Sequence, residues 1–297
     1  MSKPAAAGPT GLLVVDKEAG WTSHDVVARV RSLFSQRRVG HAGTLDPDAT
    51  GVLLVGLGRV TRLLRFLSGL TKEYSAEIVL GAATDTLDAS GVVVGEWDMS
   101  AVTLEDARAA ARSLTGDIQQ VPPMVSAVKI GGRRLHELAR RGVDVERAPR
   151  RVSVERFDLE TSAEPGVLSA RIVCSSGTYI RVIGDDLGRL LGGGAHVRHL
   201  RRLRVGSFVD AEAKTVGELG PEAVRSPAEA MRDLERVTVD PEVAALVARG
   251  RPLDCDPLSA TGEGPYAIVD ATGRLLAVYE ATGTHAMRAA VVLATAR

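Results

Sequence analysis

Residues 37–51 read RRVGHAGTLDPDATG, and this stretch sets the layout of the N-terminal part of the chain. Glycine, proline and aspartate are too frequent in it for a regular element, so the sequence predicts a long loop over residues 37–51. Ser23 is the expected N-cap of a preceding helix, whose apolar residues recur on one face as far as Phe34. An earlier apolar run, Leu12–Val15, predicts a strand.

Beyond the loop, strand and helix patterns follow one another without regular alternation. Strands are predicted at Ser75–Leu80, Val152–Leu159, Leu168–Cys174 and Tyr179–Ile183, and helices from Thr103 to about Leu114 and at Leu187–Leu191. A mixture of short strands and amphipathic helices of this kind favours an α+β fold. Near the C-terminus, the stretch Val243–Gly250 is followed by strand-like Tyr266–Val269, Arg274–Tyr279 and Ala290–Leu293, which indicate a small β-rich module.

The composition excludes several classes of protein. An apolar fraction of 45% with 25% charged residues is that of a globular chain with a large core. The apolar runs are far shorter than the roughly 20 residues of a membrane helix, and the N-terminus lacks the apolar core of a signal peptide. Cys174 and Cys255 form no C-x-x-C pattern, which argues against a disulfide framework or a zinc site. A cytoplasmic location is expected.

The net charge of zero conceals an uneven distribution. The chain up to Arg204 has 28 Lys and Arg against 23 Asp and Glu, whereas the remainder has 9 against 14. Basic residues concentrate in residues 129–151 and 189–204. One such run is usually a solvated face, but two in the same part of a neutral protein point to nucleic acid.

The sequence of the predicted loop argues against two kinds of site, a phosphate-binding loop and a metal site. It lacks the G-x-x-x-x-G-K-[ST] order of a phosphate-binding loop, and no histidine pattern typical of metal ligands accompanies it. Asp46, between Leu45 and Pro47, remains as either a turn former or a catalytic carboxylate. These residues alone leave both readings open.

Six motifs resemble, in order, the signature of the TruB family of bacterial tRNA pseudouridine synthases. The match extends over about residues 11–210, with departures from the frequent family tyrosine at Val125 and His136. The matching stretches are Gly20–Asp25 with Arg38–Leu53, Lys72–Tyr74, Gly81–Gly91, Val121–Lys129 with His136–Gly142, Ser176–Arg181, and His199–Arg204.

The resemblance implies that the chain isomerises uridine to pseudouridine at position 55, in the T-loop of tRNA, with Asp46 as nucleophile. An ionised carboxylate in a largely dry pocket needs a cationic neighbour, and Arg181 matches the family residue in that role. Tyr74 matches the family residue that stacks on the target base. Tyr179 matches a second tyrosine of the pocket, and Leu200 matches a residue that forms an apolar wall. The implied site needs no metal and no cofactor.

The target nucleotide has to be flipped out of the folded tRNA. His41 matches the residue thought to fill the vacated stack, and Arg62 stands where the family usually has lysine and would hold a phosphate. The remaining predicted RNA contacts are basic residues of the two basic runs: Lys129, Arg140, Arg141, Arg201 and Arg202.

The implied fold is a pseudouridine-synthase-type mixed or antiparallel sheet with flanking helices and a small, PUA-like C-terminal domain. The expected domains are a flexible tail at 1–10, a catalytic domain at 11–236 with a basic RNA-binding insertion at about 121–151, and the C-terminal domain at 237–297. The expected partner is the T-stem-loop of tRNA, bound by a monomer that needs neither a membrane, a partner protein nor a guide RNA.

Two alternatives come from different classes. A tRNA-binding or tRNA-folding chaperone would not need the set of Asp46, Tyr74, Tyr179 and Arg181. The related archaeal and eukaryotic enzyme works with a guide RNA and protein partners, and the basic insertion after Pro122–Pro123 argues against it.

Overall fold

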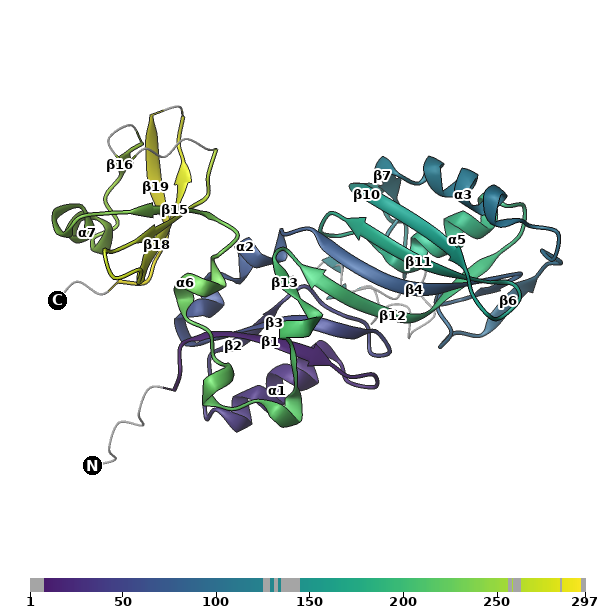
Figure 1. Cartoon of the computed structure of the whole chain (residues 1–297), viewed down its shortest axis with the longest axis horizontal. Coiled ribbons are helices and arrows are strands. Elements are labelled where there is room, and N and C mark those ends of the chain that lie inside the picture. The colour runs from purple at the N-terminus through teal and green to yellow at the C-terminus, as the bar shows by residue number, and fades with distance from the viewer. Residues whose placement is uncertain are drawn as a thin grey trace.

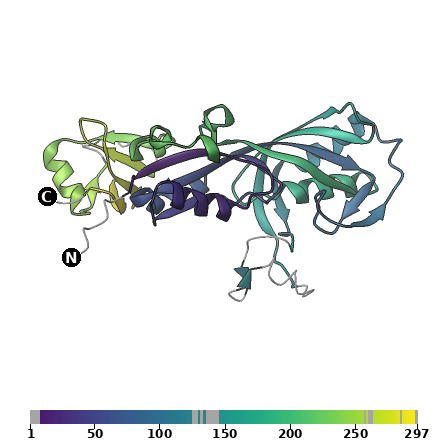
Figure 2. The same ribbon diagram turned by 90° about the horizontal axis from the view of Figure 1, so that it is seen from below.

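A computed structural model describes residues 8–124, 129–130, 133–134, 145–255, 258, 263–283 and 285–294. The molecule is elongated, with a large sheet along its length and a small second sheet at one end (Figures 1 and 2).

Ten strands form the main sheet. In chain order they are β1 (Gly11–Lys17), β2 (Val39–Ala42), β3 (Thr50–Leu57), β4 (Lys72–Leu80), β7 (Gly116–Gln120), β10 (Arg150–Thr161), β11 (Val167–Cys174), β12 (Ala195–Val205), β13 (Phe208–Val209) and β14 (Lys214–Thr215). Their path is β14-β1-β3-β12-β4-β11-β10-β7, with β2 beside β3 and β13 beside β12. The β1–β14 and β3–β12 pairs are parallel and the others antiparallel, so the predicted mixed sheet is confirmed.

Helices cover one face of this sheet and a second apolar layer covers part of the other. Strand residues alternate between the faces: Leu13 and Val15 pack with one cluster, whereas Leu12 and Val14 pack with the other. The first cluster includes three helices: α1 (Ser23–Leu33), α3 (Leu104–Ser113) and α5 (Ile180–Leu190). The second includes η1 (Gly58–Arg62), α2 (Leu64–Ser68) and α6 (Pro227–Ala230).

Smaller elements complete the chain. Two hairpin-like pairs are β5 (Ala82–Thr84) with β6 (Val93–Glu96) and β8 (Lys129–Ile130) with β9 (Arg133–Arg134). Short 3-10 turns are η2 (Asp210–Glu212), η3 (Val216–Glu218) and η4 (Pro221–Ala223).

The second sheet confirms the predicted β-rich C-terminal part. Its order is β15-β17-β18-β19-β16, and it is accompanied by one helix. Its elements are β15 (Glu235–Thr238), α7 (Pro241–Ala248), β16 (Leu253–Asp254), β17 (Tyr266–Val269), β18 (Leu275–Ala281) and β19 (Ala286–Val292). The likeness to the PUA fold stays a prediction.

Three arginines at a spacing of three residues join the second sheet to η1 and α2. Arg59 donates to the carbonyl of Leu293 at 2.7 Å, and Arg62 donates to that of Val292 at 2.8 Å. Arg65 forms an ion pair of 2.9 Å with Glu280. Apolar residues of β17, β18 and β19 belong to the same buried cluster as η1 and α2, so the two sheets share a core.

Three local predictions were wrong. Thr22, not Ser23, is the N-cap of α1, where Thr22 and Asp25 form a capping box. Residues 37–51 are not all loop, because β2 lies inside the stretch and β3 begins at Thr50. Tyr179–Ile183 is not a strand, although the run is rich in β-forming residues. Ile180, Ile183 and Leu187 are buried against the sheet as one face of a helix. The N-cap residue of this helix is Tyr179. The helix capped by Thr103 is confirmed.

In the part of the chain that the structure describes, no helix is long and apolar enough to cross a membrane.

Candidate active site

A cavity of about 360 Å³ lies beside the loop that carries Asp46, a volume typical of small-molecule pockets. Its walls come from Gly43–Asp46, from Ser68, Lys72 and Tyr74, from Ser175–Arg181, and from Leu200 and Arg202. The structure therefore brings together five residues that the sequence placed in the site by resemblance: Asp46, Tyr74, Tyr179, Arg181 and Leu200.

Asp46 is held by Arg181, in the first turn of α5. The Nε of Arg181 lies 2.9 Å from the Asp46 carboxylate, and the Arg181 side chain is only 4% exposed. A second nitrogen of Arg181 donates to the carbonyl of Thr86 at 2.7 Å and lies 3.4 Å from the Asp88 carboxylate. The guanidinium therefore has a fixed direction, set by α5 and the β5–β6 turn, and presents one edge to Asp46.

Opposing influences act on the pKa of Asp46. Burial raises it most, Asp88 raises it further, and Arg181 lowers it, with a raised pKa as the result. Since 39% of the Asp46 side chain is still exposed, the carboxylate is surrounded by protein yet open toward the cavity. A carboxylate of raised pKa is a stronger base and nucleophile than a free aspartate, provided that the pH keeps it ionised.

Two buried side chains fix the backbone on either side of Asp46. The Oγ of Ser23 accepts a hydrogen bond from the Leu45 amide at 2.9 Å and donates to the Leu45 carbonyl at 3.1 Å. The ammonium of Lys17, with no exposed surface, donates to the carbonyls of Pro47, Trp21 and Glu18. Burial lowers the pKa of Lys17 to about 8. Asp46 is therefore flanked by two tethered residues.

Arg202 differs from its predicted place on an RNA-binding surface. Its side chain is 1% exposed, and its guanidinium donates to the Val52 carbonyl at 2.6 Å and the Gly43 carbonyl at 3.0 Å. Its backbone pairs with that of Gly51, whose φ is +98°. A Cβ at position 51 would lie 2.2 Å from the Arg202 carbonyl oxygen, so only glycine fits there. Arg202 thus clamps both ends of the Asp46 loop from inside the protein.

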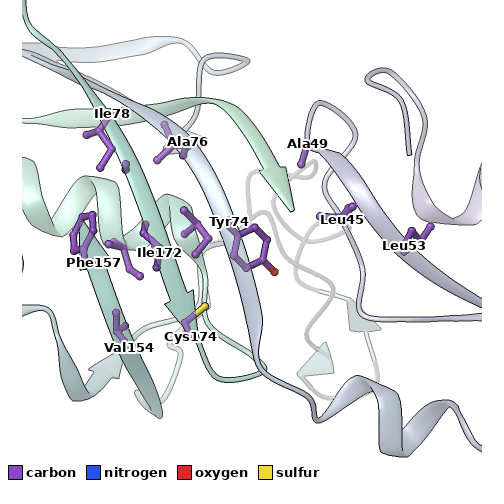
Figure 3. Close-up of a cluster of buried hydrophobic side chains, with 14 of the residues drawn as sticks. Leu45, Ala49, Leu53, Tyr74, Ala76, Ile78, Val154, Phe157, Ile172 and Cys174 are labelled. Atoms are coloured by element: carbon purple, nitrogen blue, oxygen red, sulfur yellow. The ribbon is translucent and has the colours of Figure 1, made fainter. Parts of the chain in front are cut away.

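The two tyrosines and Leu200 form the other walls. Tyr74, on β4, is 8% exposed, and its hydroxyl points away from the packed side chains of Phe157 and Ile172 (Figure 3). Burial raises the pKa of Tyr74, so its phenol stays protonated at neutral pH. Tyr179 is the N-cap residue of α5, two positions before Arg181. Leu200 follows His199, whose φ of +51° lies in a register shift of β12 against β4.

His41 lies on β2 and does not belong to the cavity lining. Its ring meets that of His24 edge-on, with centroids 5.5 Å apart. Among the described residues its buried Nδ1 has no hydrogen-bond partner. Burial lowers the pKa of His41 to about 4, so the ring is neutral at physiological pH.

Two of the other predicted contacts, Arg62 and Arg201, do not line the cavity. Arg62 contacts β19 of the second sheet, as described above, instead of the pocket. Arg201 forms a two-pronged ion pair with Asp16 at 2.9 and 3.0 Å. Arg140, Arg141 and the side chain of Lys129 fall outside the described residues. Within the described ranges, no group of three or more His, Cys, Asp or Glu side chains could hold a metal ion.

Sequence reasoning did not assign the residues that support Asp46. Ser23 lies in the Gly20–Asp25 motif and Lys17 lies just before it. A lysine at the end of a strand and a serine at the start of a helix are common in proteins of any function, so neither residue indicated a role. Asp88 lies in the Gly81–Gly91 motif, whose composition is that of a turn. Their contacts with the loop and with Arg181 join residues far apart in the sequence, so no local pattern predicts them. The one signal in the sequence was the occurrence of these motifs together.

We expect Ser23→Ala to lower the free energy of unfolding by about 1–3 kcal/mol, because the buried amide and carbonyl of Leu45 lose their partner. Urea unfolding measures the loss. Ser32→Ala, at an exposed position of the same helix, is the control and should stay within about 0.5 kcal/mol of the parent. Equal midpoints for the two variants would show that the Ser23 bridge does not stabilise the loop.

Comparisons with known proteins identify the family of the chain. The family description "TruB family pseudouridylate synthase (N terminal domain)" matches residues 31–180, and "tRNA pseudouridylate synthase B C-terminal domain" matches residues 181–244. The chain is 46% identical to the tRNA pseudouridine synthase B of Rhodococcus jostii (strain RHA1), over 95% of this chain and 93% of that protein. It is 50% identical to the protein of the same name from Symbiobacterium thermophilum, over 83% and 84% of the two chains.

A solved structure supports the fold. A chain of a Cbf5-Nop10-Gar1 complex superposes with a TM-score of 0.74 at 26% identity, covering 95% of this chain and 83% of that one. Family match, high coverage and fold agree, and the chain belongs to the TruB family of pseudouridylate synthases.

Proposed function

We propose that this protein converts uridine to pseudouridine at position 55, in the T-loop of tRNA, with Asp46 as the nucleophile. The observation that carries the proposal is the 2.9 Å ion pair between Arg181 and Asp46 in a cavity that Tyr74 also lines. The tRNA substrate is inferred from the names of the relatives from Rhodococcus jostii and Symbiobacterium thermophilum.

The cavity suits a single flipped-out uridine. Tyr74 offers an aromatic surface for stacking, which contributes about 1–3 kcal/mol per base in single-stranded recognition. Leu200 supplies an apolar wall, and the carboxylate of Asp46 reaches the same space. Extrusion of the base costs a few kcal/mol, and His41, neutral and outside the cavity, is the residue we propose to fill the vacated stack.

The reaction is an isomerisation, so its atoms balance without a second substrate. The C1′–N1 bond of uridine breaks, the uracil turns, and a C1′–C5 bond forms while C5 loses a proton and N1 gains one. Asp46 forms a covalent bond to the sugar or the base during this exchange, and Arg181 holds the carboxylate anionic before attack. Tyr179 lines the same cavity, and we propose that it takes part in removal of the C5 proton.

We propose that the protein acts on tRNA without a guide RNA or a partner protein. The basic run at residues 129–151 would contact the phosphates of the T-arm, including through Lys129, Arg140 and Arg141. Of the other predicted contacts, Arg201 is already paired with Asp16, and Arg62 bonds the second sheet. The insertion is therefore the main candidate for electrostatic binding.

A T-arm stem-loop transcript tests the proposal directly. The pure protein, in excess EDTA and without nucleotides, should convert the uridine at position 55 completely, as mapped by chemical modification and primer extension. A transcript with cytidine at that position should give no product. Binding without conversion would identify an RNA-binding chaperone instead, and conversion only after addition of a second RNA or protein would contradict independent action.

A further inference from the structure

Gln120, the last residue of β7, bonds to the backbone of Tyr179 in both directions. The Tyr179 amide donates to the Gln120 Oε1 at 3.0 Å, and the Gln120 Nε2 donates to the Tyr179 carbonyl at 3.2 Å. The side chain of Gln120 is buried, with 2% of the residue exposed. The two residues lie 59 positions apart in the chain, so this contact is not a consequence of local folding.

The two halves of the contact differ in importance. The Tyr179 carbonyl also accepts from the amides of Val182 and Ile183, in the first turn of α5. For the Tyr179 amide, Gln120 is the acceptor that the structure gives. Tyr179 is the N-cap residue of α5 and its own side chain makes no capping hydrogen bond. Gln120 therefore fixes the backbone at the point where α5 begins.

Gln120 also marks the base of the basic insertion. Its register partner on β10 is Arg150, so the chain leaves the sheet after Gln120 and re-enters it at Arg150. Two residues beyond Gln120, the carbonyl of Pro122 accepts a hydrogen bond of 3.1 Å from Arg147, which closes the base of the insertion. The side chain of Gln120 thus joins the base of the segment proposed to bind RNA to Tyr179 of the cavity wall.

We infer that Gln120 is a positioning residue for the reaction: it sets the place of Tyr179, and through the start of α5 that of Arg181, relative to Asp46. The inference rests on the proposed function. A group displaced by about 1 Å in an active site costs up to about a hundredfold in rate. Loss of the Gln120 contact should therefore slow the chemical step and leave RNA binding largely unchanged.

The test compares Gln120→Met with Gln119→Met. Methionine keeps the length of the side chain and removes both hydrogen bonds. Gln119 is the neighbouring residue on β7 and is exposed, so it is a matched control. With saturating T-arm transcript, the single-turnover rate of Gln120→Met should fall about 10- to 100-fold, and its Kd should stay within about threefold of the parent. Gln119→Met should match the parent in both.

Gln120→Asn provides a second reading if the methionine variant does not fold. Asparagine keeps the donor and the acceptor of glutamine, but its side chain is one methylene shorter and no longer brings the oxygen to the Tyr179 amide. The single-turnover rate of Gln120→Asn should therefore fall at least about threefold below that of the parent, with a Kd within about threefold of the parent.

Several results would overturn the inference. One is equal rates for the two methionine variants, a second is a weakened Kd with an unchanged single-turnover rate, and a third is a single-turnover rate of Gln120→Asn equal to that of the parent. An inactive parent protein would instead contradict the proposed function, so the two failures are distinguishable.

Discussion

Asp46→Asn should abolish pseudouridine formation, with a rate reduction of at least about 10⁴-fold, while tRNA still binds within about tenfold of the parent affinity. Asparagine keeps the shape of the side chain, but its amide cannot form the covalent bond to the nucleotide that the ionised carboxylate forms. Because the Asp46 side chain is 39% exposed and points to the cavity, the fold should tolerate the change. Single-turnover mapping and fluorescence anisotropy measure the two quantities.

Asp48→Asn is the matched control, because Asp48 lies two residues further along the same loop and is exposed. It should retain activity close to that of the parent. Turnover by Asp46→Asn at the level of Asp48→Asn would remove Asp46 from the proposed mechanism.

The second large effect is expected for Arg181→Met. The guanidinium lies 2.9 Å from Asp46 and lowers the pKa of that carboxyl against the effect of burial. Without it the pKa of Asp46 rises further, so a smaller fraction is ionised at a given pH. The single-turnover rate at pH 7 should fall about 10²- to 10³-fold. The acid limb of the pH–rate profile should move to higher pH.

The direction in which the acid limb moves distinguishes a change in the pKa of Asp46 from a disturbance of the fold. Arg189→Met, on the same helix and with 71% of its side chain exposed, should change neither the rate nor the profile. Arg181→Lys keeps the charge but loses the planar contact with Asp46 and Thr86, and should lie between the two methionine variants. A rate loss in Arg181→Met with an unmoved acid limb would show that Arg181 does not control the ionisation of Asp46.

Local patterns predicted the elements that depend on local signals. The helix after Thr103 has a capping box and an apolar face, and both were readable in the sequence. The strands β4 and β11 followed from alternation and apolar runs. The helix at Ile180 was misassigned because its first turn is rich in β-forming residues, whereas Ile180, Ile183 and Leu187 pack against the sheet along one helical face.

The residues of the candidate site were predicted from motif resemblance, and the structure adds the contacts that hold them. Arg202 illustrates the difference: a basic run predicts a surface, yet this arginine turns inward to clamp Gly43 and Val52, residues 159 and 150 positions away. Arg62 likewise contacts β19, 230 positions along the chain. No periodicity or local charge pattern encodes contacts at such separations.

The release of tritium from a T-arm transcript labelled at C5 of the uridine at position 55 measures the isomerisation itself, because the reaction has to break that C5–H bond. We expect the parent protein and Asp48→Asn to release one equivalent of tritium per transcript, and Asp46→Asn to release none. Release by Asp46→Asn at the parent rate would contradict the role of Asp46 as nucleophile, and no release by the parent protein would contradict the proposed reaction.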